Sequence, residues 1–159
     1  MAKKNYIGFI FDFNTWGINT SLEDYRLCQF LNKHLNWQLQ RTNDIEISTS
    51  TKDNIQIFNT YQYINQHDFY EIELIQNKKA GNILIPELRN IDFLLLQRGE
   101  TDYFDKHTFS KTIIEIAGIQ TAMQIDIDTL KSRHNLLISH FNESEEKKNK
   151  NYSNNWPCE

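Results

Sequence analysis

The stretch Ile85-Pro86-Glu87-Leu88-Arg89-Asn90-Ile91-Asp92-Phe93 opens the most apolar segment of the chain, Phe93 to Leu96. Four consecutive apolar residues without alternation are typical of a strand that is covered on both faces, so residues 93 to 96 are predicted to lie mid-sheet. Proline lacks a backbone donor and is confined to strand edges, starts and bulges. Pro86 is therefore expected to end an edge segment, after which Glu87 turns the chain toward the central strand.

The N-terminal part predicts a strand followed by a helix. Residues 6 to 13 alternate apolar side chains, which indicates a half-buried strand. The sequence Thr20-Ser21-Leu22-Glu23 matches a capping box, and a helix from about 21 to 35 is expected after it. Its buried stripe is formed by Leu27, Cys28, Leu31 and Leu35.

Between Trp37 and Arg98 the pattern changes to short alternating strands, as expected for antiparallel strands with one wet face. Their apolar positions are Ile45, Ile47, Ile55, Ile57, Tyr61, Tyr63, Tyr70, Ile72 and Leu74. Polar breaks at 48–54, 65–68 and 77–82 contain the turn formers Asn, Asp, Ser and Gly. A meander is the simplest path through these strands.

The C-terminal part predicts a helix from Asp105 to Ala117, ended by Gly118, and a last strand at 119–127. The helix is expected to bury Phe109, Ile113, Ile116 and Ala117, and the strand to point Ile119, Thr121, Met123, Ile125 and Ile127 inward. Residues 142–159 are rich in Asn, Ser, Glu and Lys and are predicted to be a disordered polar tail. The expected fold is a single α+β domain over 1–141, with a mainly antiparallel sheet and two helices on one face, in the order β-α-β(several)-α-β.

Composition bounds the class of protein. A chain of 159 residues with a 39% hydrophobic share can bury one packed core. The net charge of -4 and the scattered Lys and Arg residues argue against nucleic acid as the main partner. No run approaches the ~20 apolar residues of a membrane span. Two cysteines, Cys28 and Cys158, do not make a disulfide framework. A cytoplasmic protein with no membrane partner is expected.

Three stretches together resemble the bacterial IPExxxVDY family. Residues 85–93 are similar to its signature, with Ile91 for the usual Val and Phe93 for the usual Tyr. Asp24-Tyr25-Arg26 looks like the family's Asp-Tyr-Arg-Leu run, and 130–137 carries a Leu-Lys-Ser-x-x-Asn-Leu-Leu segment. The resemblance covers most of residues 5 to 138, and it implies no biochemical activity because the family has none established. Its candidate residues are Asp24, Tyr25, Arg26, Ile85, Pro86, Glu87, Ile91, Asp92 and Phe93.

Three acids of these motifs could carry either chemistry or structure. Asp24 projects onto the helix side that should face the sheet, where an unpaired carboxylate is costly, so it is expected to meet Arg, Lys or backbone donors. Glu87 and Asp92 could form an acid-base pair of the kind that glycosidases use. Nothing in the sequence supplies a sugar platform, and turn acids commonly bind backbone amides. The structural interpretation is favoured for all three, and no catalytic residue is assigned.

No metal or cofactor is predicted either. The five histidines, at 34, 67, 107, 134 and 140, show no zinc-site spacing. Asp102, Asp105 and His107 could bind a cation, but a helix N-terminus attracts acids anyway. Cys28 lies in an apolar stripe and is expected to be a small core residue rather than a nucleophile. The chain also lacks a glycine-rich phosphate loop and a Gly-x-Ser-x-Gly elbow.

The favoured function is a non-enzymatic protein-binding or assembly module, whose partner is an unknown protein or a second copy of the chain. A sheet face with exposed tyrosines could be covered by such a partner. Its aromatic residues are Tyr61, Tyr63, Tyr70, Phe58 and Phe69.

Two alternatives remain open. The same aromatic face could stack bases, and genes of the resembled family often lie near those for ribonuclease III and fatty-acid synthesis, which favours an RNA-linked accessory protein. The third hypothesis is a small enzyme that uses Asp24, Glu87 or Asp92 as acid or base.

Overall fold

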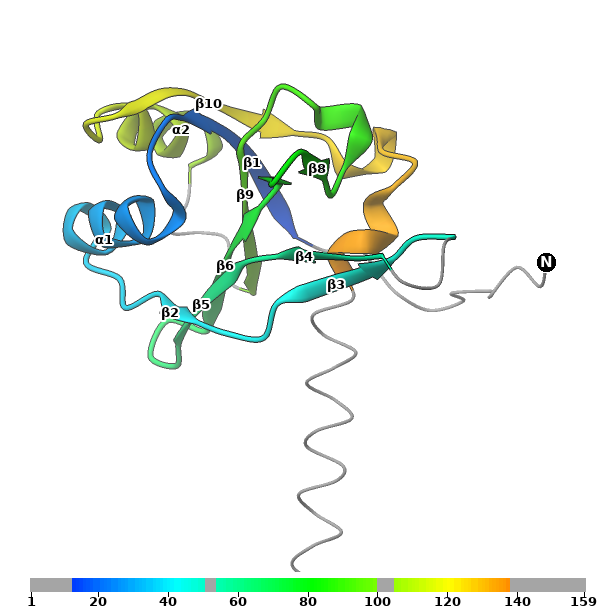
Figure 1. Cartoon of the computed structure of the whole chain (residues 1–159). Helices are drawn as coiled ribbons and strands as arrows, with labels where there is room; N and C mark the ends of the chain where they lie inside the picture. The colour runs from blue at the N-terminus through cyan, green and yellow to red at the C-terminus, as the bar shows by residue number, and fades with distance from the viewer. Residues whose placement is uncertain (1–12, 51–53, 100–104, 138–159) are drawn as a thin grey trace, which may run out of the picture.

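The computed structural model describes residues 13–50, 54–99 and 105–137. Within this part, a six-stranded antiparallel sheet has the order β10-β1-β9-β6-β5-β2, and two α-helices cover one of its faces (Figure 1). The predicted α+β class and element order are confirmed. The strands are β1 (Asn14–Thr20), β2 (Gln40–Arg41), β5 (Thr60–Asn65), β6 (Tyr70–Gln76), β9 (Phe93–Gly99) and β10 (Ile119–Ile125). The helices are α1 (Asp24–Leu35) and α2 (Lys106–Ile114).

The central position of β9 explains its unbroken apolar run. It pairs with β1 on one side and β6 on the other, as predicted. Successive side chains of a strand point to opposite faces of the sheet. Phe93 and Leu95 therefore face the helices, whereas Leu94 and Leu96 face the opposite side, and both sides are buried.

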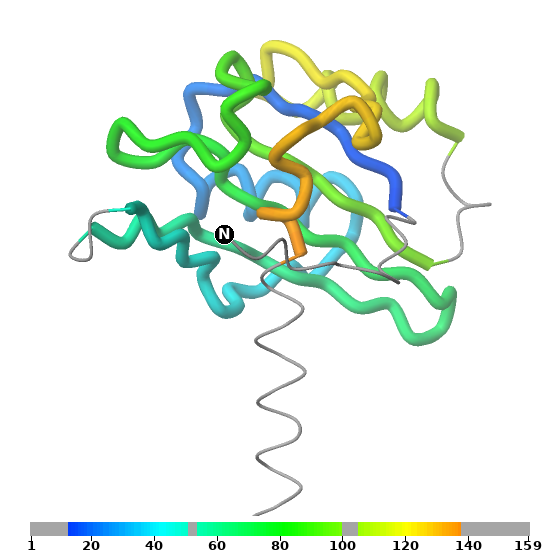
Figure 2. Tube along the Cα trace, turned by 90° about the vertical axis from the view of Figure 1, so that its right-hand side faces the viewer, coloured from blue at the N-terminus to red at the C-terminus, as the bar shows by residue number. Residues whose placement is uncertain are grey.

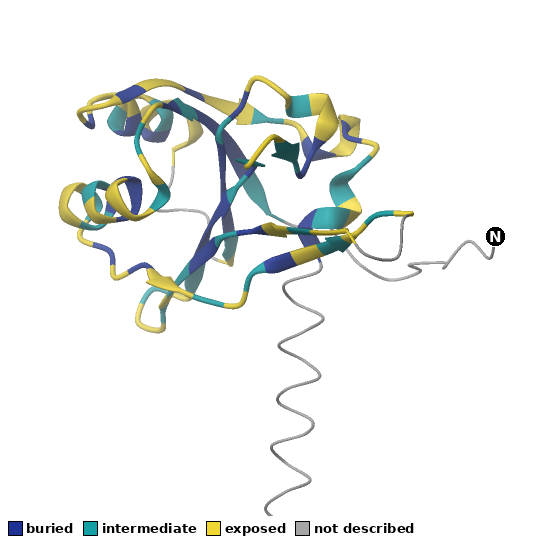
Figure 3. Ribbon diagram, viewed as in Figure 1, coloured by how far each residue is buried: buried dark blue, intermediate teal, exposed yellow. Residues whose placement is uncertain are grey.

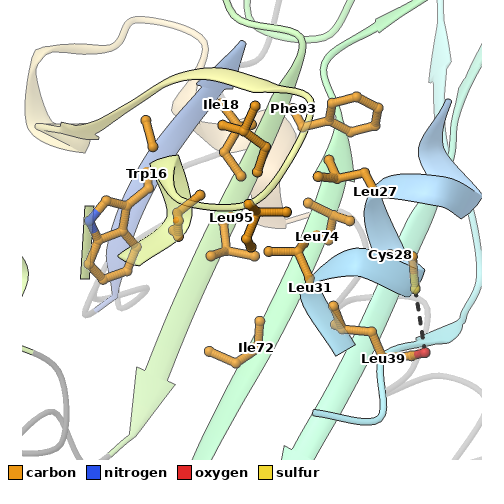
Figure 4. Close-up of a cluster of buried hydrophobic side chains, with 14 of the residues drawn as sticks. Trp16, Ile18, Leu27, Cys28, Leu31, Leu39, Ile72, Leu74, Phe93 and Leu95 are labelled. Carbon is orange, nitrogen blue, oxygen red and sulfur yellow. Dashed lines mark hydrogen bonds between the residues drawn. The ribbon is translucent and has the colours of Figure 1, made fainter. Parts of the chain in front are cut away.

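The helix-side cluster fills the space between the sheet and the two helices (Figure 4). Leu27, Cys28 and Leu31 of the predicted α1 stripe are buried in it, and Leu35 packs at its margin. The ring of Trp16 meets that of Phe109 edge-on, with 4.6 Å between centroids. This contact joins β1 directly to α2.

The loop-side cluster covers the other face of the sheet with irregular structure (Figure 2). It is built from a hairpin of β3 (Ile45–Ser48) and β4 (Ile55–Phe58), a short hairpin of β7 (Lys78–Lys79) and β8 (Asn82–Ile83), and three 3-10 turns. The turns are η1 (Pro86–Leu88), η2 (Ile127–Thr129) and η3 (Arg133–Leu137). The simple meander is therefore wrong, because the hairpin of β3 and β4 leaves the main sheet.

The N-terminal strand differs from the expected one. Residues 6–12 of the predicted strand lie outside the described residues, as does the predicted tail at 142–159. The strand β1 begins at Asn14, in a sequence with two Asn, two Thr and one Gly that shows little hydropathy signal. Two contacts with distant segments position this strand: the Asn14 amide donates to Gln97 Oε1 at 2.8 Å, and Gly17 lies tightly against Ile91.

The predicted capping box at Thr20 is wrong. Thr20 is the last residue of β1, and its hydroxyl donates to the Gly118 carbonyl oxygen at 2.6 Å and accepts from the Leu22 amide at 3.1 Å. The helix begins at Asp24, with Glu23 as a cap residue whose side chain makes no capping hydrogen bond. The Thr20 hydroxyl thus links the end of β1 to Gly118, just before β10.

Two features of the C-terminal part also differ from expectation. The helix α2 ends at Ile114, so Ala117 is exposed. A register shift opposite Asn19 and Thr20 breaks the alternation of β10. Ile119 and Ala122 consequently share the helix side, whereas Thr121 and Met123 are exposed.

The open aromatic face is not formed. Tyr61 is 8% exposed and Phe58 is fully buried, on opposite sides of the sheet. Tyr63 and Tyr70 pack against the helix-side cluster, which leaves Phe69, at 74% exposure, as the exposed member of the group. Among the described residues no helix is long and apolar enough to cross a membrane.

Glycine is required at position 118 for two separable reasons. Gly118 and Gly81 both have positive φ, at 91° and 80°, where a Cβ costs ~1–2 kcal/mol. A Cβ on Gly118 would also lie 2.9 Å from Leu22 Cδ1, whereas a Cβ on Gly81 would meet nothing within 4 Å. Gly118→Ala should therefore lower the free energy of unfolding by ~1–3 kcal/mol more than Gly81→Ala, because of overpacking. Urea unfolding of both variants measures the difference. Equal losses of unfolding free energy would show that the Leu22 side chain moves aside at no cost.

Candidate functional site

The motif residues lie at two junctions of the fold. Asp24, Tyr25 and Arg26 form the first turn of α1. Residues 85–93 run from the end of β8 through η1 into β9. Their apolar members Ile85, Ile91 and Phe93 are buried in the two clusters, while Pro86 opens η1 as its first residue. The candidate site therefore consists of the polar motif residues and the groups that hold them.

Asn77 holds the second junction together, although its side chain belongs to no motif. It is fully buried, and its Nδ2 donates to the carbonyl oxygens of Ile91 at 2.8 Å and Leu88 at 3.0 Å. Its Oδ1 accepts from the Ile85 amide at 2.9 Å. These three bonds satisfy backbone groups of the turn that have no strand partner, which is a requirement for burying them.

Asp92 connects the same turn to the end of β1 and to β7. Its Oδ2 accepts from the Thr20 amide at 3.0 Å, and its Oδ1 accepts from Lys78 Nζ at 3.1 Å. The Asp92 amide in turn donates to the Ile18 carbonyl oxygen. Asp92 thus serves as the backbone-binding turn acid that the sequence predicted.

Asp24 is held by a set of donors from neighbouring strands. Its Oδ2 accepts from Asn59 Nδ2 at 2.7 Å and from the Tyr61 hydroxyl at 3.0 Å, and Arg41 Nη1 lies 3.6 Å away. The Asp24 side chain is 13% exposed, so the predicted pairing of this carboxylate is confirmed. Burial opposes its ionisation, but the hydrogen bonds from Asn59 and Tyr61, with the charge of Arg41, outweigh it and lower the pKa of Asp24.

The third family-like stretch meets the second. Glu87 Oε1 accepts from the backbone amide of Ser132 at 2.9 Å, and Asn135 Nδ2 donates to the Leu84 carbonyl oxygen at 2.9 Å. The slight burial of Glu87 raises its pKa less than its hydrogen bonds with Ser132 and the nearby backbone lower it. Glu87 and Asp92 therefore bind different segments and share no hydrogen-bond partner among the described residues.

The strand β7 connects the first motif with the second. Lys79 Nζ donates to Asn59 Oδ1 at 2.6 Å, and the other end of the Asn59 amide binds Asp24. Lys78, its chain neighbour, binds Asp92. The second and third stretches are thus joined directly by hydrogen bonds, and the first is linked to the second indirectly, through Asn59 and the two lysines of β7.

Tyr25 and Arg26 differ from the acids around them. The Tyr25 side chain is 56% exposed, and Arg26 is exposed as well. Neither side chain has a hydrogen bond or ion pair with the described part of the chain. The first turn of α1 therefore combines a fixed acid with two side chains that project from the surface.

Concave surfaces lie elsewhere. Four hollows of about 370 to 420 Å³ lie among the described residues, and no motif residue lines any of them. Cys28 is buried, and burial together with the charge of Asp24 raises the pKa of its thiol to about 11. No group of three His, Cys, Asp or Glu side chains in the described ranges could hold a metal ion; of the proposed cation group, Asp102 lies outside those ranges.

Sequence reasoning missed Asn77, Asn59, Lys79 and Arg41. The turn composition of residues 77–82 predicts a polar break at Asn77 but not the burial of its side chain. The available signal was its position directly after the apolar run of β6, where a polar residue enters the core. The other three residues contact Asp24, directly or through Asn59, from positions 17 to 55 residues along the chain, so no local pattern reveals them.

A scan against models of known protein families finds no match, and a search of curated proteins likewise finds none. The resemblance to the IPExxxVDY family therefore stays a prediction that rests on the three stretches.

Removal of the Asn77 side chain tests its role. Asn77→Ala would leave the Ile85 amide and the Ile91 carbonyl oxygen without their side-chain partner, at a cost of ~1–3 kcal/mol for each group left unsatisfied, whereas the Leu88 carbonyl oxygen still accepts from the Ile91 amide. We expect a loss of ~2–6 kcal/mol in the free energy of unfolding, measured in urea. The control Asn90→Ala, at an exposed position of the same turn, should stay within ~0.5 kcal/mol of the unsubstituted chain. Equal effects at both positions would contradict the role of Asn77.

The lowered pKa of Asp24 makes its contribution dependent on pH. A carboxylate whose folded pKa lies below the unfolded value of ~3.9 stabilises the fold fully above that value and loses the effect as pH falls through the folded pKa. Asp24→Asn should therefore cost ~1.5–3 kcal/mol at neutral pH and progressively less below pH ~4. Urea unfolding across this range measures the difference. Asp128→Asn, at an exposed ion pair, is the control; a cost of Asp24→Asn that is independent of pH would contradict the assignment.

Proposed function

We propose that the chain is a non-enzymatic, cytoplasmic protein-binding module, and that Tyr25 and Arg26 form the centre of its contact surface. The observation that carries the proposal is the contrast within the first turn of α1. The Asp24 carboxylate accepts hydrogen bonds from Asn59 and Tyr61. The side chains of Tyr25 and Arg26, in contrast, are exposed and have no hydrogen-bond partner in the described chain.

The chemistry of the two exposed residues supports this proposal. Tyr and Arg are enriched among the residues that dominate the binding energy of protein interfaces. Tyr25 offers a large apolar ring with a polar tip, and Arg26 offers five donors in a planar fork. A partner would need an apolar depression for the ring and a carboxylate or carbonyl groups for the guanidinium.

The support beneath these residues reduces the cost of binding. The helix start is fixed by Asp24, which is held from β2, from β5 and from Asn59. A surface that is already ordered loses less conformational entropy on association. Arg41 lies beside Asp24 with a partly exposed charge, but it is paired with Asp44. The rim is thus polar and nearly neutral, which suits a protein partner better than a polyanion.

The two alternatives lack such support. The acids considered for catalysis are occupied by hydrogen bonds, and none of them lines a hollow among those described. An RNA-linked role, including one with ribonuclease III, relied on an aromatic platform, and Tyr61 and Phe58 are buried. Membership of the IPExxxVDY family remains part of the proposal and is supported by the contact of the second stretch with the third, between Glu87 and Ser132.

Copurification with paired variants tests the contact surface. The tagged full chain is expected to retain a recurring protein partner, identified by mass spectrometry and then titrated as a purified protein. Tyr25→Ala and Arg26→Ala should each weaken that binding by more than ~30-fold, the effect of losing ~2 kcal/mol at a dominant interface residue.

Lys33→Ala is the matched control, because Lys33 is exposed near the other end of the same helix. All three variants should keep the unfolding midpoint of the unsubstituted chain. Partner binding that survives in the double variant Tyr25→Ala with Arg26→Ala would overturn the proposed surface, and bound RNA in place of protein would favour the alternative.

A further inference from the structure

The strand β10 forms a long open edge of the main sheet. It is hydrogen-bonded to β1 and to no other described strand, and it lies along the upper rim of the molecule (Figure 1). Its seven residues, Ile-Gln-Thr-Ala-Met-Gln-Ile, carry no charge and no proline. An edge strand presents a row of unpaired backbone donors and acceptors, which other strands can bind.

The opposite edge of the same sheet is protected. There β2 has only two residues, and one of them is Arg41, whose guanidinium binds Asp44 and lies near Asp24. Short strands and edge charges are common devices against pairing between molecules. The strand β10 has neither, and its regular ladder from Thr121 to Ile125 is free of the register shift that precedes it.

The side chains of β10 are correspondingly open to solvent. Gln120, Thr121 and Gln124 are exposed, and Met123 is 49% exposed. The ribbon of β10 accordingly includes exposed stretches (Figure 3). A half-exposed methionine in the middle of an uncharged edge is an apolar group that still lacks a neighbour on one side. A strand added to this edge would supply that neighbour.

We infer that β10 pairs with β10 of a second copy of the chain, antiparallel and centred on Met123, so that two six-stranded sheets become continuous. In this register each Met123 lies opposite its symmetry mate, and Thr121 lies opposite Ile125. A pair of this length makes about six backbone hydrogen bonds, within the ~10 ± 5 of a typical protein interface. The twofold axis gives both copies the same contacts.

Charge favours a second copy as the occupant. An edge without charges pairs with itself at no repulsive cost, whereas like charges directly opposite one another destabilise a ladder. The nearest acid, Asp126, would lie opposite Gln120 and therefore meets no like charge in this register. The inference is independent of the proposed contact surface, because β10 contains neither Tyr25 nor Arg26.

Sedimentation of the full chain at micromolar concentration is the first test, with twice the chain mass as the expected result. Met123→Lys places two like charges opposite each other and should weaken dimerisation by more than ~30-fold. Ile64→Lys, at a 56% exposed position of β5 near the opposite edge, should leave the dimer intact. A monomeric unsubstituted chain, or a dimer lost only in the Ile64 variant, overturns the inference.

Cysteine cross-linking tests the register without relying on loss of binding. In a Cys158→Ser background the one remaining cysteine is Cys28, which is buried and has a pKa raised to about 11. Its thiol therefore stays protonated and does not form disulfides at mildly alkaline pH. Met123→Cys should form an intermolecular disulfide under mild oxidation, because Cα atoms ~4.5–5.5 Å apart suit one. Thr121→Cys should not, because its mate lies four residues along the ladder, ~14 Å away. Equal cross-linking at both positions overturns the proposed pairing.

Discussion

The buried amide of Asn77 is the interaction on which the rest of this fold depends. A primary amide has two hydrogen-bond donors and an acceptor oxygen, and its burial is unfavourable unless these groups form hydrogen bonds. Here both donors and the oxygen bind backbone groups of residues 85–91, while the Asn77 main chain donates to the Asp92 carbonyl oxygen and accepts from Leu84. A turn with few hydrogen bonds of its own is thereby fixed to the end of β6.

Fixing this turn positions the start of the central strand β9. Phe93 can then enter β9 with its ring toward the helices, and Asp92 is positioned to accept from the Thr20 amide. Thr20 in turn binds Gly118 through its hydroxyl, so the end of β1, four residues before α1, is connected to the start of β10. The family-like stretches are therefore best understood as a joint between the sheet, the first helix and the loop-side turns, and Tyr25 and Arg26 in the first turn of α1 are its exposed part.

Sequence patterns could predict the parts of this structure that depend on local apolar periodicity. The α1 stripe, the strand β6 and the central run at 93–96 all show their burial in neighbouring residues. The strand β4 does not, because its alternating Ile55 and Ile57 are exposed. The strand β1 does not, because Asn14 and Gly17 owe their places to Gln97 and Ile91, which lie more than seventy residues away. The same limit applies to the site: Asp24 could be recognised as needing partners, but Asn59 and Tyr61 could not be identified from any spacing.

The register shift in β10 shows how such a nonlocal contact changes a surface. Strict alternation would turn Met123 inward together with Ile119, but the Thr20 hydroxyl draws Gly118 toward β1, and the ladder shifts between Asn19 and Thr20. Met123 consequently faces outward at the sheet edge while Ala122 takes the inner place. Because the α1 start is tied to this same point, a dimer formed through β10 would hold its two copies of Tyr25 and Arg26 at a fixed separation. Two rigidly spaced contact surfaces bind a partner with two matching sites far more tightly than either surface alone, because the second contact is intramolecular. A modest surface at each α1 start would then be sufficient for an assembly module.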